Sequence, residues 1–353
     1  MFVLESVVTA PTCIAITGAT GFLGRHLVAR LAGRTRLRCI SRSGSAPEGH
    51  DGVAVDIADP DGDGTVARLA AALDGCDAVV HAAGRVSHDP ADAAALLAVH
   101  RTGTERVMAA ARAAAVPRVV HIGTSGTIAV STTPVAVDES AVEADGGAAV
   151  LQAISRWPYY RSKWLADDVA LAAHGPDLDV VVLSPGLLLG PGDDPQGAAT
   201  RPVRLFLDHA LPLVPDGGPC FVDVRDVAAA VEAALTGGAG GRRYLLGAAN
   251  WPWSRFYGAL ARITGRKAPR LQVPGRLARL AATALPGLFD EDGNLPMDAP
   301  ELELASHFWY ARWERASREL GFSPRDPLRT LEDTVADILD RRRRGWMLYG
   351  RPA

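Results

Sequence analysis

The sequence predicts an α/β protein with a doubly wound parallel sheet and a smaller, mostly helical C-terminal lobe. Three observations support this fold class. Short apolar runs alternate with longer Ala-rich segments through the first half of the chain, and a glycine-rich turn follows the first run. Beyond Pro185 the alternation ends, and glycine and proline become frequent. Repeated β–α–β units with right-handed crossovers place helices on both faces of a parallel sheet.

Each strand expected in the sheet is a short apolar run. The runs are Cys13–Thr17, Leu37–Ser41, Val53–Asp56, Ala78–His81, Val119–Gly123 and Val180–Ser184. Segments of helical length separate them, among them Ala91–Ala115 and Tyr159–Ala173. After the Gly- and Pro-rich stretch, three further elements are expected: a strand Cys220–Val224, a helix Val227–Leu235 and a strand Arg243–Leu246.

The composition excludes several classes of protein. Of 353 residues, 48% are apolar and 22% are charged, which is typical of a globular chain. The 37 basic and 40 acidic residues give a net charge of −3, which does not favour nucleic-acid binding. The four cysteines lie far apart, so we expect neither a disulfide framework nor a metal site. No membrane span or signal peptide is indicated, and we expect a cytoplasmic protein.

The glycine-rich turn TGATGFLG, residues 17–24, predicts a dinucleotide site. Gly18 is expected to permit the tight turn, Gly21 to let the backbone approach a pyrophosphate, and Gly24 to let helix and strand pack closely. Amides at the helix N-terminus would face the phosphates. The cofactor contacts predicted here are Gly18, Thr20, Gly21, Phe22, Leu23 and Gly24. A ligand-free turn is the alternative, which its position after the first strand disfavours.

The residues after the second strand predict the choice of cofactor. An acidic side chain there would bind a ribose diol, whereas Arg42 can hold a 2′-phosphate through two parallel hydrogen bonds. Arg36 and Arg38 lie upstream. The alternative for Arg42 is a solvated arginine without a ligand. We predict NADP(H) as the preferred cofactor, with NAD(H) as the second choice.

Tyr159 and Lys163 lie four residues apart in the segment YYRSK, so both project from one helix face. Lysine is scarce, because Lys163 and Lys267 are the only lysines among the 37 basic residues. A neighbouring ammonium stabilises a phenolate and is expected to lower the phenol pKa from its usual value of about 10. Tyr159 would then serve as general acid for a carbonyl oxygen or as general base for an alcohol.

A hydroxyl is expected to polarise the same oxygen. The segment GTSGT, residues 123–127, follows a predicted strand at the edge where α/β sites gather. Thr124 is the first choice and Ser125 the second. The alternative for either is a loop hydroxyl that bonds to its own backbone.

Together these residues resemble the extended short-chain dehydrogenase/reductase family, part of the NAD-dependent epimerase/dehydratase superfamily, over nearly the whole chain. The branch most similar is that of the dihydroflavonol reductase-like and 3β-hydroxysteroid dehydrogenase-like proteins. The resemblance implies that Tyr159 donates the proton, that Lys163 tunes its pKa and binds the ribose, and that Thr124 orients the carbonyl. It also implies a homodimer.

The resemblance implies further cofactor contacts in three segments. They are Asp56 and Ile57 beside the adenine, Ala82, Ala83 and Gly84 in the loop along the cofactor, and Pro185, Gly186 and Leu188 near the nicotinamide. Two positions depart from the family's pattern. His100 stands where the family has Asn before Gly-Thr, and Ser184 stands where Arg or Asn often precedes Pro-Gly.

The domain prediction follows from this assignment. Residues 11–185 and 220–250 would form an NADP-binding Rossmann domain, and residues 186–219 and 251–353 a substrate-binding lobe. Aromatic residues in the lobe favour an apolar or aromatic substrate or a secondary metabolite, although tryptophan at helical spacing is more often core. They are Trp251, Trp253, Phe256, Phe289, Phe308, Trp309, Tyr310 and Trp313.

Three functions compete. The leading one is NADPH-dependent reduction of a small-molecule carbonyl, or the reverse alcohol oxidation. The alternative is a sugar-nucleotide epimerase, against which stand Arg42 and the GPGD segment at 190–193. A sensing module without chemistry is less favoured, since such relatives lose the Tyr or the Lys. Two features stay open between binding and structural roles: His88 with Asp89, and the run Arg341–Arg344 at the end of a helix.

Overall fold

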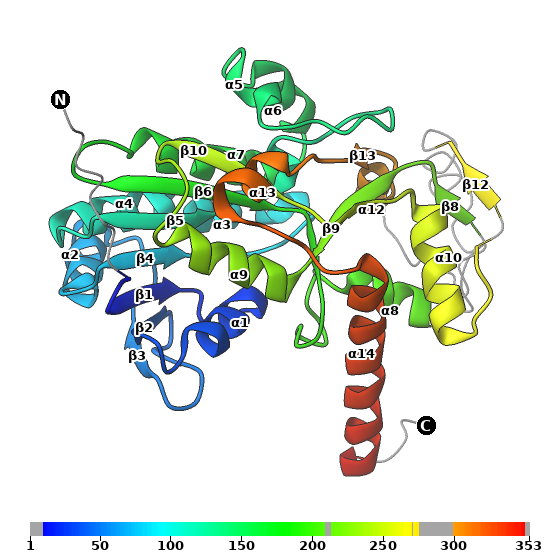
Figure 1. The fold of residues 1–353 in the computed structure, drawn as a ribbon, viewed down its shortest axis with the longest axis horizontal. Helices are drawn as coiled ribbons and strands as arrows, with labels where there is room; N and C mark the ends of the chain where they lie inside the picture. Colours follow the sequence, from blue (N-terminus) through cyan, green and yellow to red (C-terminus); the bar gives the residue numbers. More distant parts are fainter. Residues whose placement is uncertain (1–9, 209–212, 270, 275–298, 350–353) are drawn as a thin grey trace.

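Seven parallel strands form the main sheet of this computed structural model, which describes residues 10–208, 213–269, 271–274 and 299–349 (Figure 1). Their order is β10–β6–β5–β4–β1–β2–β3, and every neighbouring pair is parallel. The bounds are β1 Cys13–Thr17, β2 Arg36–Ser41, β3 Asp51–Ala54, β4 Ala78–His81, β5 Arg118–Ile122, β6 Asp179–Pro185 and β10 Arg242–Leu246. The order reverses between β1 and β4, where ligands bind in such sheets. The predicted doubly wound α/β fold is confirmed.

Helices cover both faces of the main sheet, and the buried strands are therefore continuous apolar runs in the sequence. Helices α1 (Phe22–Leu31) and α9 (Val224–Ala234) bury one face, and α2 (Gly62–Leu73), α4 (Gly103–Ala113) and α7 (Pro158–Ala172) bury the other. β1 and β4 begin and end at the predicted residues. β3 begins and ends two residues before the predicted Val53–Asp56. It is one of the two edge strands of the sheet and mostly exposed, so its apolar pattern is weak.

The segment predicted as one helix, Ala91–Ala115, is divided. A 3₁₀ turn η1 (Pro90–Asp92) and helix α3 (Ala93–Leu97) precede a π-helical turn η2 (Ala98–Thr102), which leads into α4. The π-helical turn contains His100, whose side chain is buried. A π turn changes the helical period, and such turns are frequent at functional sites.

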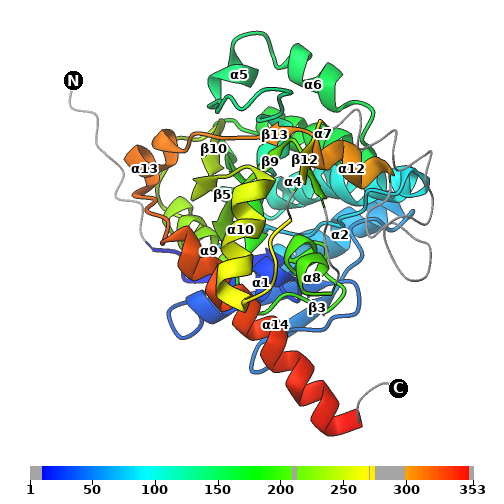
Figure 2. The ribbon, with the colours of Figure 1, turned by 90° about the vertical axis from the view of Figure 1, so that its right-hand side faces the viewer.

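The lobe combines helices with small sheets, at the right of Figure 1. β9 is flanked by β7, β11 and β13, and β8 pairs with β12. These strands are β7 Leu187–Leu189, β8 Leu213–Pro215, β9 Gly218–Asp223, β11 Ala249–Asn250, β12 Leu271–Val273 and β13 Phe308–Trp309. The lobe's helices include α8 Arg201–Asp208, α10 Trp253–Thr264, α12 Ala299–Ala305 and α14 Pro327–Tyr349. Helices α5 (Ser140–Glu143) and α6 (Ala148–Ile154) form a separate projection at the top of Figure 2.

Two segments do not pack in the domain that the sequence analysis predicted for them. β9 extends into the predicted Rossmann segment 220–250, yet it pairs with β7 of the second sheet instead of the main sheet. Helix α13 (Glu314–Leu320), within the predicted lobe, buries Ala316 and Leu320 in the core beneath α9 and β10. The division into two domains remains a prediction. The chain passes between the main sheet and the lobe more often than that prediction assumed.

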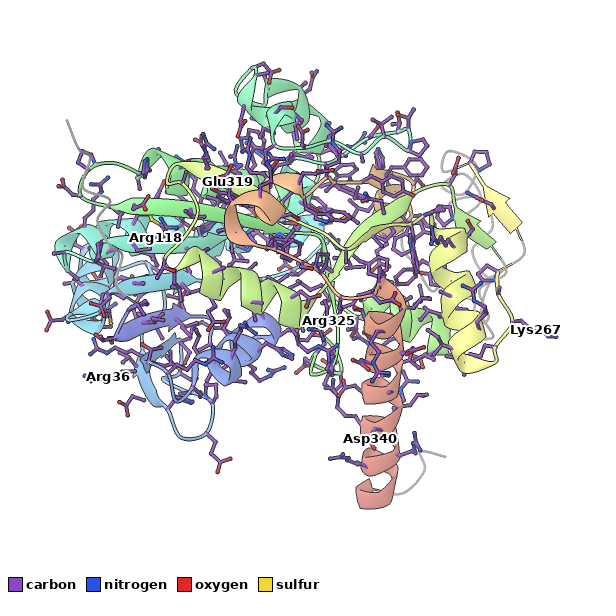
Figure 3. The ribbon with its side chains drawn as sticks, in the orientation of Figure 1. Arg36, Arg118, Lys267, Glu319, Arg325 and Asp340 are labelled. Atoms are coloured by element: carbon purple, nitrogen blue, oxygen red, sulfur yellow. The ribbon has the colours of Figure 1, made fainter. Side chains whose placement is uncertain are left out.

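Helix α14 extends away from both layers, and its arginine run is largely paired (Figure 1). Arg341 forms an ion pair with Asp337, and Arg342 forms one with Asp208 at 2.7 Å. Arg344 forms one with Asp340, which Figure 3 labels on this helix. These pairs favour a structural role for the run. In the described part of the chain, no helix is long and apolar enough to cross a membrane.

Candidate active site

A cavity of about 330 Å³ opens where the carboxyl ends of the main strands meet the lobe. Ten of the predicted site residues line it: Leu23, Ala82, Ala83, Gly84, Thr124, Tyr159, Lys163, Pro185, Gly186 and Leu188. Ser125, the second-choice hydroxyl, also lines it. The other predicted cofactor contacts lie along the same edge of the sheet but outside this wall: Gly18, Thr20, Gly21, Phe22, Gly24, Arg42, Asp56 and Ile57.

The glycine-rich turn has the shape that a dinucleotide requires. Gly18 has φ +73°, and a Cβ there would lie 2.8 Å from the backbone of Ala82. A Cβ at Gly24 would lie 2.1 Å from the carbonyl oxygen of Gly18, so helix and turn can meet only through glycine. The first turn of α1 has no acidic residue and no side-chain cap, which leaves its amides for an anion. The residues present therefore fit a bound pyrophosphate.

Of the three arginines near the second strand, Arg42 is the one at the carboxyl edge of the sheet. It is exposed and directly follows β2 at the carboxyl edge of the sheet. Arg38 donates to the carbonyl oxygens of Ala72 and Asp74 at 2.7 and 2.8 Å, and so caps the C-terminus of α2. Arg36 begins β2, at the end opposite Arg42 (Figure 3).

Tyr159 and Thr124 meet in the cavity. Pro158 occupies the first turn of α7, where proline is favoured, and Tyr159 follows it. Both side chains line the cavity, and the Thr124 hydroxyl favours the ionised form of the Tyr159 phenol. Burial, and to a smaller extent the charge of Asp167, raise the pKa of Tyr159 to about 12, and Thr124 opposes the rise. The predicted lowering of this pKa by Lys163 is not found in this structure, where burial dominates and the charge of Lys163 has no resolved effect on the phenol.

Lys163 lies buried one turn below Tyr159. Its ammonium donates to the carbonyl oxygen of Ile122 at 2.6 Å. Burial lowers the pKa of Lys163, and the charge of Asp167 raises it. Asp167 follows one further turn along α7 and is fully buried.

Asp167 is a functional candidate that the sequence interpretation missed. It accepts hydrogen bonds from Nε2 of His121 at 3.1 Å and from the hydroxyl of Thr127 at 2.9 Å. Burial opposes its ionisation, yet the bond from His121 and the charge of Lys163 hold the pKa of Asp167 below its usual value. The spacing Tyr159–Lys163–Asp167, at four-residue steps, was the signal that could have revealed it.

His100 links the loop after β4 to helix α7. Its Nε2 accepts from the main-chain N–H of Arg85 at 3.1 Å, so its Nδ1 carries the proton and donates to Ser162 Oγ at 2.8 Å. Ser162 Oγ donates in turn to the carbonyl oxygen of Tyr159 at 2.8 Å. Burial and the charge of Lys163 lower the pKa of His100 to about 3, so the ring is neutral. The neutral histidine thus acts here as both acceptor and donor.

One wall of the cavity is aromatic. Tyr160 stacks on Trp309 with ring centroids 4.6 Å apart, and His88 lies over Tyr160 at 6.3 Å. His88 lines the cavity, whereas the Asp89 carboxylate accepts from the N–H of Ala91 and caps η1.

Of the aromatic residues predicted in the lobe, Trp253 and Trp309 line this cavity. Trp251 and Phe256 pack in the lobe core against Phe221. The buried rings of Phe308 and Tyr310 pack against each other, and Trp313 packs against the buried core. Phe289 lies outside the described residues.

Two further sequence features contribute little here. Lys267 is exposed beyond the end of α10, at the outer edge of the lobe in Figure 3. Ser184 is buried in β6 and lies outside the cavity wall. Among the described residues, no group of three His, Cys, Asp or Glu could hold a metal ion.

Comparison with known proteins places this site in a family. A model of the NAD-dependent epimerase/dehydratase family matches residues 14–247. A putative dihydroflavonol 4-reductase from Synechocystis sp. is 29% identical over 341 residues, 93% of each chain. Sterol demethylase protein B from Methylococcus capsulatus is 29% identical over 92% of this chain and 98% of that protein. The crystal structure of gox2253 superimposes with a TM-score of 0.74 and 25% identity, over 94% of this chain and 98% of that chain.

Proposed function

We propose that this chain, which belongs to the NAD-dependent epimerase/dehydratase family, is an NADPH-dependent reductase of a small-molecule carbonyl compound. As an enzyme it is an NAD(P)-dependent oxidoreductase of the extended short-chain dehydrogenase/reductase type. The observation that carries the proposal is the meeting of Thr124, Tyr159 and Lys163 in one cavity. With its pKa raised to about 12, Tyr159 holds its proton at neutral pH, so proton donation depends on stabilisation of the phenolate that forms.

The proposed reaction assigns one task to each side chain. When bound, the nicotinamide cofactor supplies the hydride that reduces a carbonyl carbon. Thr124 hydrogen-bonds to the carbonyl oxygen and orients it beside the phenol. Tyr159 donates its proton to that oxygen as negative charge develops there. The ammonium of Lys163, buried beneath, stabilises the phenolate that remains.

The cofactor would lie along the predicted contacts, from the glycine-rich turn through Ala82–Gly84 to Pro185–Leu188. The preference for NADPH depends on Arg42, which is exposed at the end of β2 and can bind a 2′-phosphate with its planar fork. Asp56 and Ile57 would contact the adenine.

We propose an apolar or aromatic substrate. Tyr160, Trp309, Trp253 and Leu187 give the cavity an apolar wall beside Tyr159. The relative named as a dihydroflavonol 4-reductase supports reduction of such a compound. A sugar-nucleotide epimerase remains the second candidate on the family description. The apolar wall disfavours it, since a nucleotide sugar needs polar partners.

We also propose a homodimer and a cytoplasmic location. The dimer rests on the family resemblance, and static light scattering at micromolar concentration would test it. The free, buried thiols of Cys13, Cys39, Cys76 and Cys220 support a reducing compartment.

Turnover at 340 nm tests the function directly. NADPH and NADH are each mixed with a panel of aliphatic and aryl ketones, steroids, flavonoids and nucleotide sugars. We expect oxidation of NADPH by an apolar ketone and slower oxidation of NADH. Interconversion of a nucleotide sugar without net consumption of cofactor would replace this proposal with the epimerase.

A further inference from the structure

A second cavity of about 160 Å³ adjoins the first. The two cavities share six wall residues: His88, Tyr160, Leu187, Ala198, Pro202 and Trp253. Because these side chains face both spaces, the second cavity begins where the aromatic wall beside Tyr159 ends. It continues into the lobe, between α8, α10 and α12.

The rest of the second cavity is largely apolar. Its remaining apolar and aromatic wall residues are Leu205, Val214, Pro215, Tyr257, Leu304 and Ala305. Arg201 and Glu301 also line it, and they pair with each other through two hydrogen bonds of 2.6 and 2.8 Å. This bidentate pair neutralises both charges. The wall therefore suits a hydrocarbon group and offers no net charge to a phosphate.

The volume sets the size of that group. An apolar cavity of about 150 Å³ holds a benzene molecule. At 160 Å³, this cavity has room for about six carbon atoms. A substrate that places its carbonyl at Tyr159 and a six-carbon group in the second cavity would run beside Tyr160 and Trp253.

We propose that the second cavity binds an apolar tail of about six carbons on the carbonyl substrate, and that Leu205 sets the length accepted. This proposal rests on the proposed reductase function. Leu205 is buried on α8 and lines the second cavity without lining the first. It can therefore change tail recognition without touching the carbonyl site.

A series of alkyl phenyl ketones, with alkyl chains of one to eight carbons, tests the proposal. With NADPH at 340 nm, kcat/KM is expected to rise about fourfold for each methylene and to level off near six carbons. Leu205→Trp should lower kcat/KM for the six-carbon ketone more than tenfold relative to the one-carbon ketone. Leu205→Ala should move the plateau to longer chains.

The two Leu205 variants are expected to change the preferred chain length in opposite directions. This distinguishes altered tail recognition from misfolding, because a damaged fold would lower turnover of ketones of every chain length. Val203→Ala is the matched control, since Val203 lies buried on the same helix outside both walls. It should keep the wild-type ratio of long-chain to short-chain kcat/KM.

Two results would overturn the proposal, and they can be told apart. If the one-carbon ketone is reduced but the profile is flat with chain length, the tail site is wrong and the reductase function stands. If NADPH is oxidised by no ketone of the series or of the wider panel, both are wrong.

Discussion

The ammonium of Lys163 donates to the carbonyl oxygen of Ile122 at 2.6 Å and so ties helix α7 to the last residue of strand β5. Thr124 follows that strand end by two residues, and Tyr159 lies one turn before Lys163 on the helix. The bond therefore holds the two halves of the proposed catalytic pair at a constant separation. A buried ammonium is tolerated only with such partners.

Replacement of Lys163 is the first test of this arrangement. Lys163→Met removes both the bond to Ile122 and the positive charge beneath Tyr159, and we expect kcat/KM to fall at least about a hundredfold. Lys267→Met is the matched control, because Lys267 is exposed at the outer edge of the lobe. It should keep wild-type turnover at 340 nm. Equal losses in the two variants would contradict a special role for Lys163.

Cofactor choice should depend on one end of β2. Arg42→Asp removes the proposed phosphate partner and should raise the KM for NADPH by about ten- to hundredfold, as expected for hydrogen bonds to a charged group. The same change at Arg36, also exposed but at the other end of the strand, should leave the ratio of NADPH to NADH use unaltered. A wild-type ratio in Arg42→Asp would remove the basis for the NADPH preference.

Asp167 is expected to act through Lys163 as a positioning residue. Its charge raises the pKa of Lys163, so Asp167→Asn should lower that pKa and move the alkaline limb of the pH–kcat profile to lower pH. The free energy of unfolding, measured in urea, should be lower than that of the wild type by about 3–5 kcal/mol, because the buried ammonium of Lys163 loses its counter-charge. Asp168→Asn, on the exposed side of α7, should change neither quantity. An unshifted pH profile in Asp167→Asn would leave only a structural role.

The buried histidines predict an acid-sensitive fold. Burial lowers the pKa values of His81, His100 and His121, so the unfolded chain binds protons below about pH 6.5 that the native state does not. Stability is then complete above that pH and is lost as the pH falls, by up to about 1.4 kcal/mol per pH unit for each histidine.

His100→Asn isolates one of these histidines. An amide can accept from Arg85 and donate to Ser162 as the ring does, so the fold should survive at pH 7. The free energy of unfolding, measured at pH 7, 6 and 5, should fall less steeply with acid in this variant than in the wild type. The difference in slope should correspond to about one fewer proton taken up on unfolding. An identical slope in the variant and the wild type would contradict the neutral His100 described above.

Strands β1 and β4 were predictable to the residue because each is a continuous apolar run buried on both faces, whereas the bounds of the exposed strand β3 were not. The turn at Gly18 was predictable because few residues other than glycine adopt its backbone. The π-helical turn around His100 was not, since an inserted residue in a helix leaves no local signature in composition.

The pKa of Tyr159 is a second property that could not be predicted from the sequence. Sequence spacing places the ammonium of Lys163 near the phenol, but the burial that raises the pKa depends on the lobe packed over it. Likewise, β9 reads as a strand from its own residues, yet its pairing with β7 depends on segments distant in the chain. Local chemistry was accessible from the sequence, whereas desolvation and long-range pairing required the fold.

The most direct test of the proposed function is a single-turnover measurement of NADPH oxidation at 340 nm in Tyr159→Phe, with a ketone that the wild type reduces. Phenylalanine keeps the ring against Tyr160 and removes the proton donor. We expect the rate of hydride transfer to fall by about 10²–10⁴-fold, with NADPH binding, followed by its fluorescence, little changed. A single-turnover rate equal to that of the wild type would show that Tyr159 is not the acid.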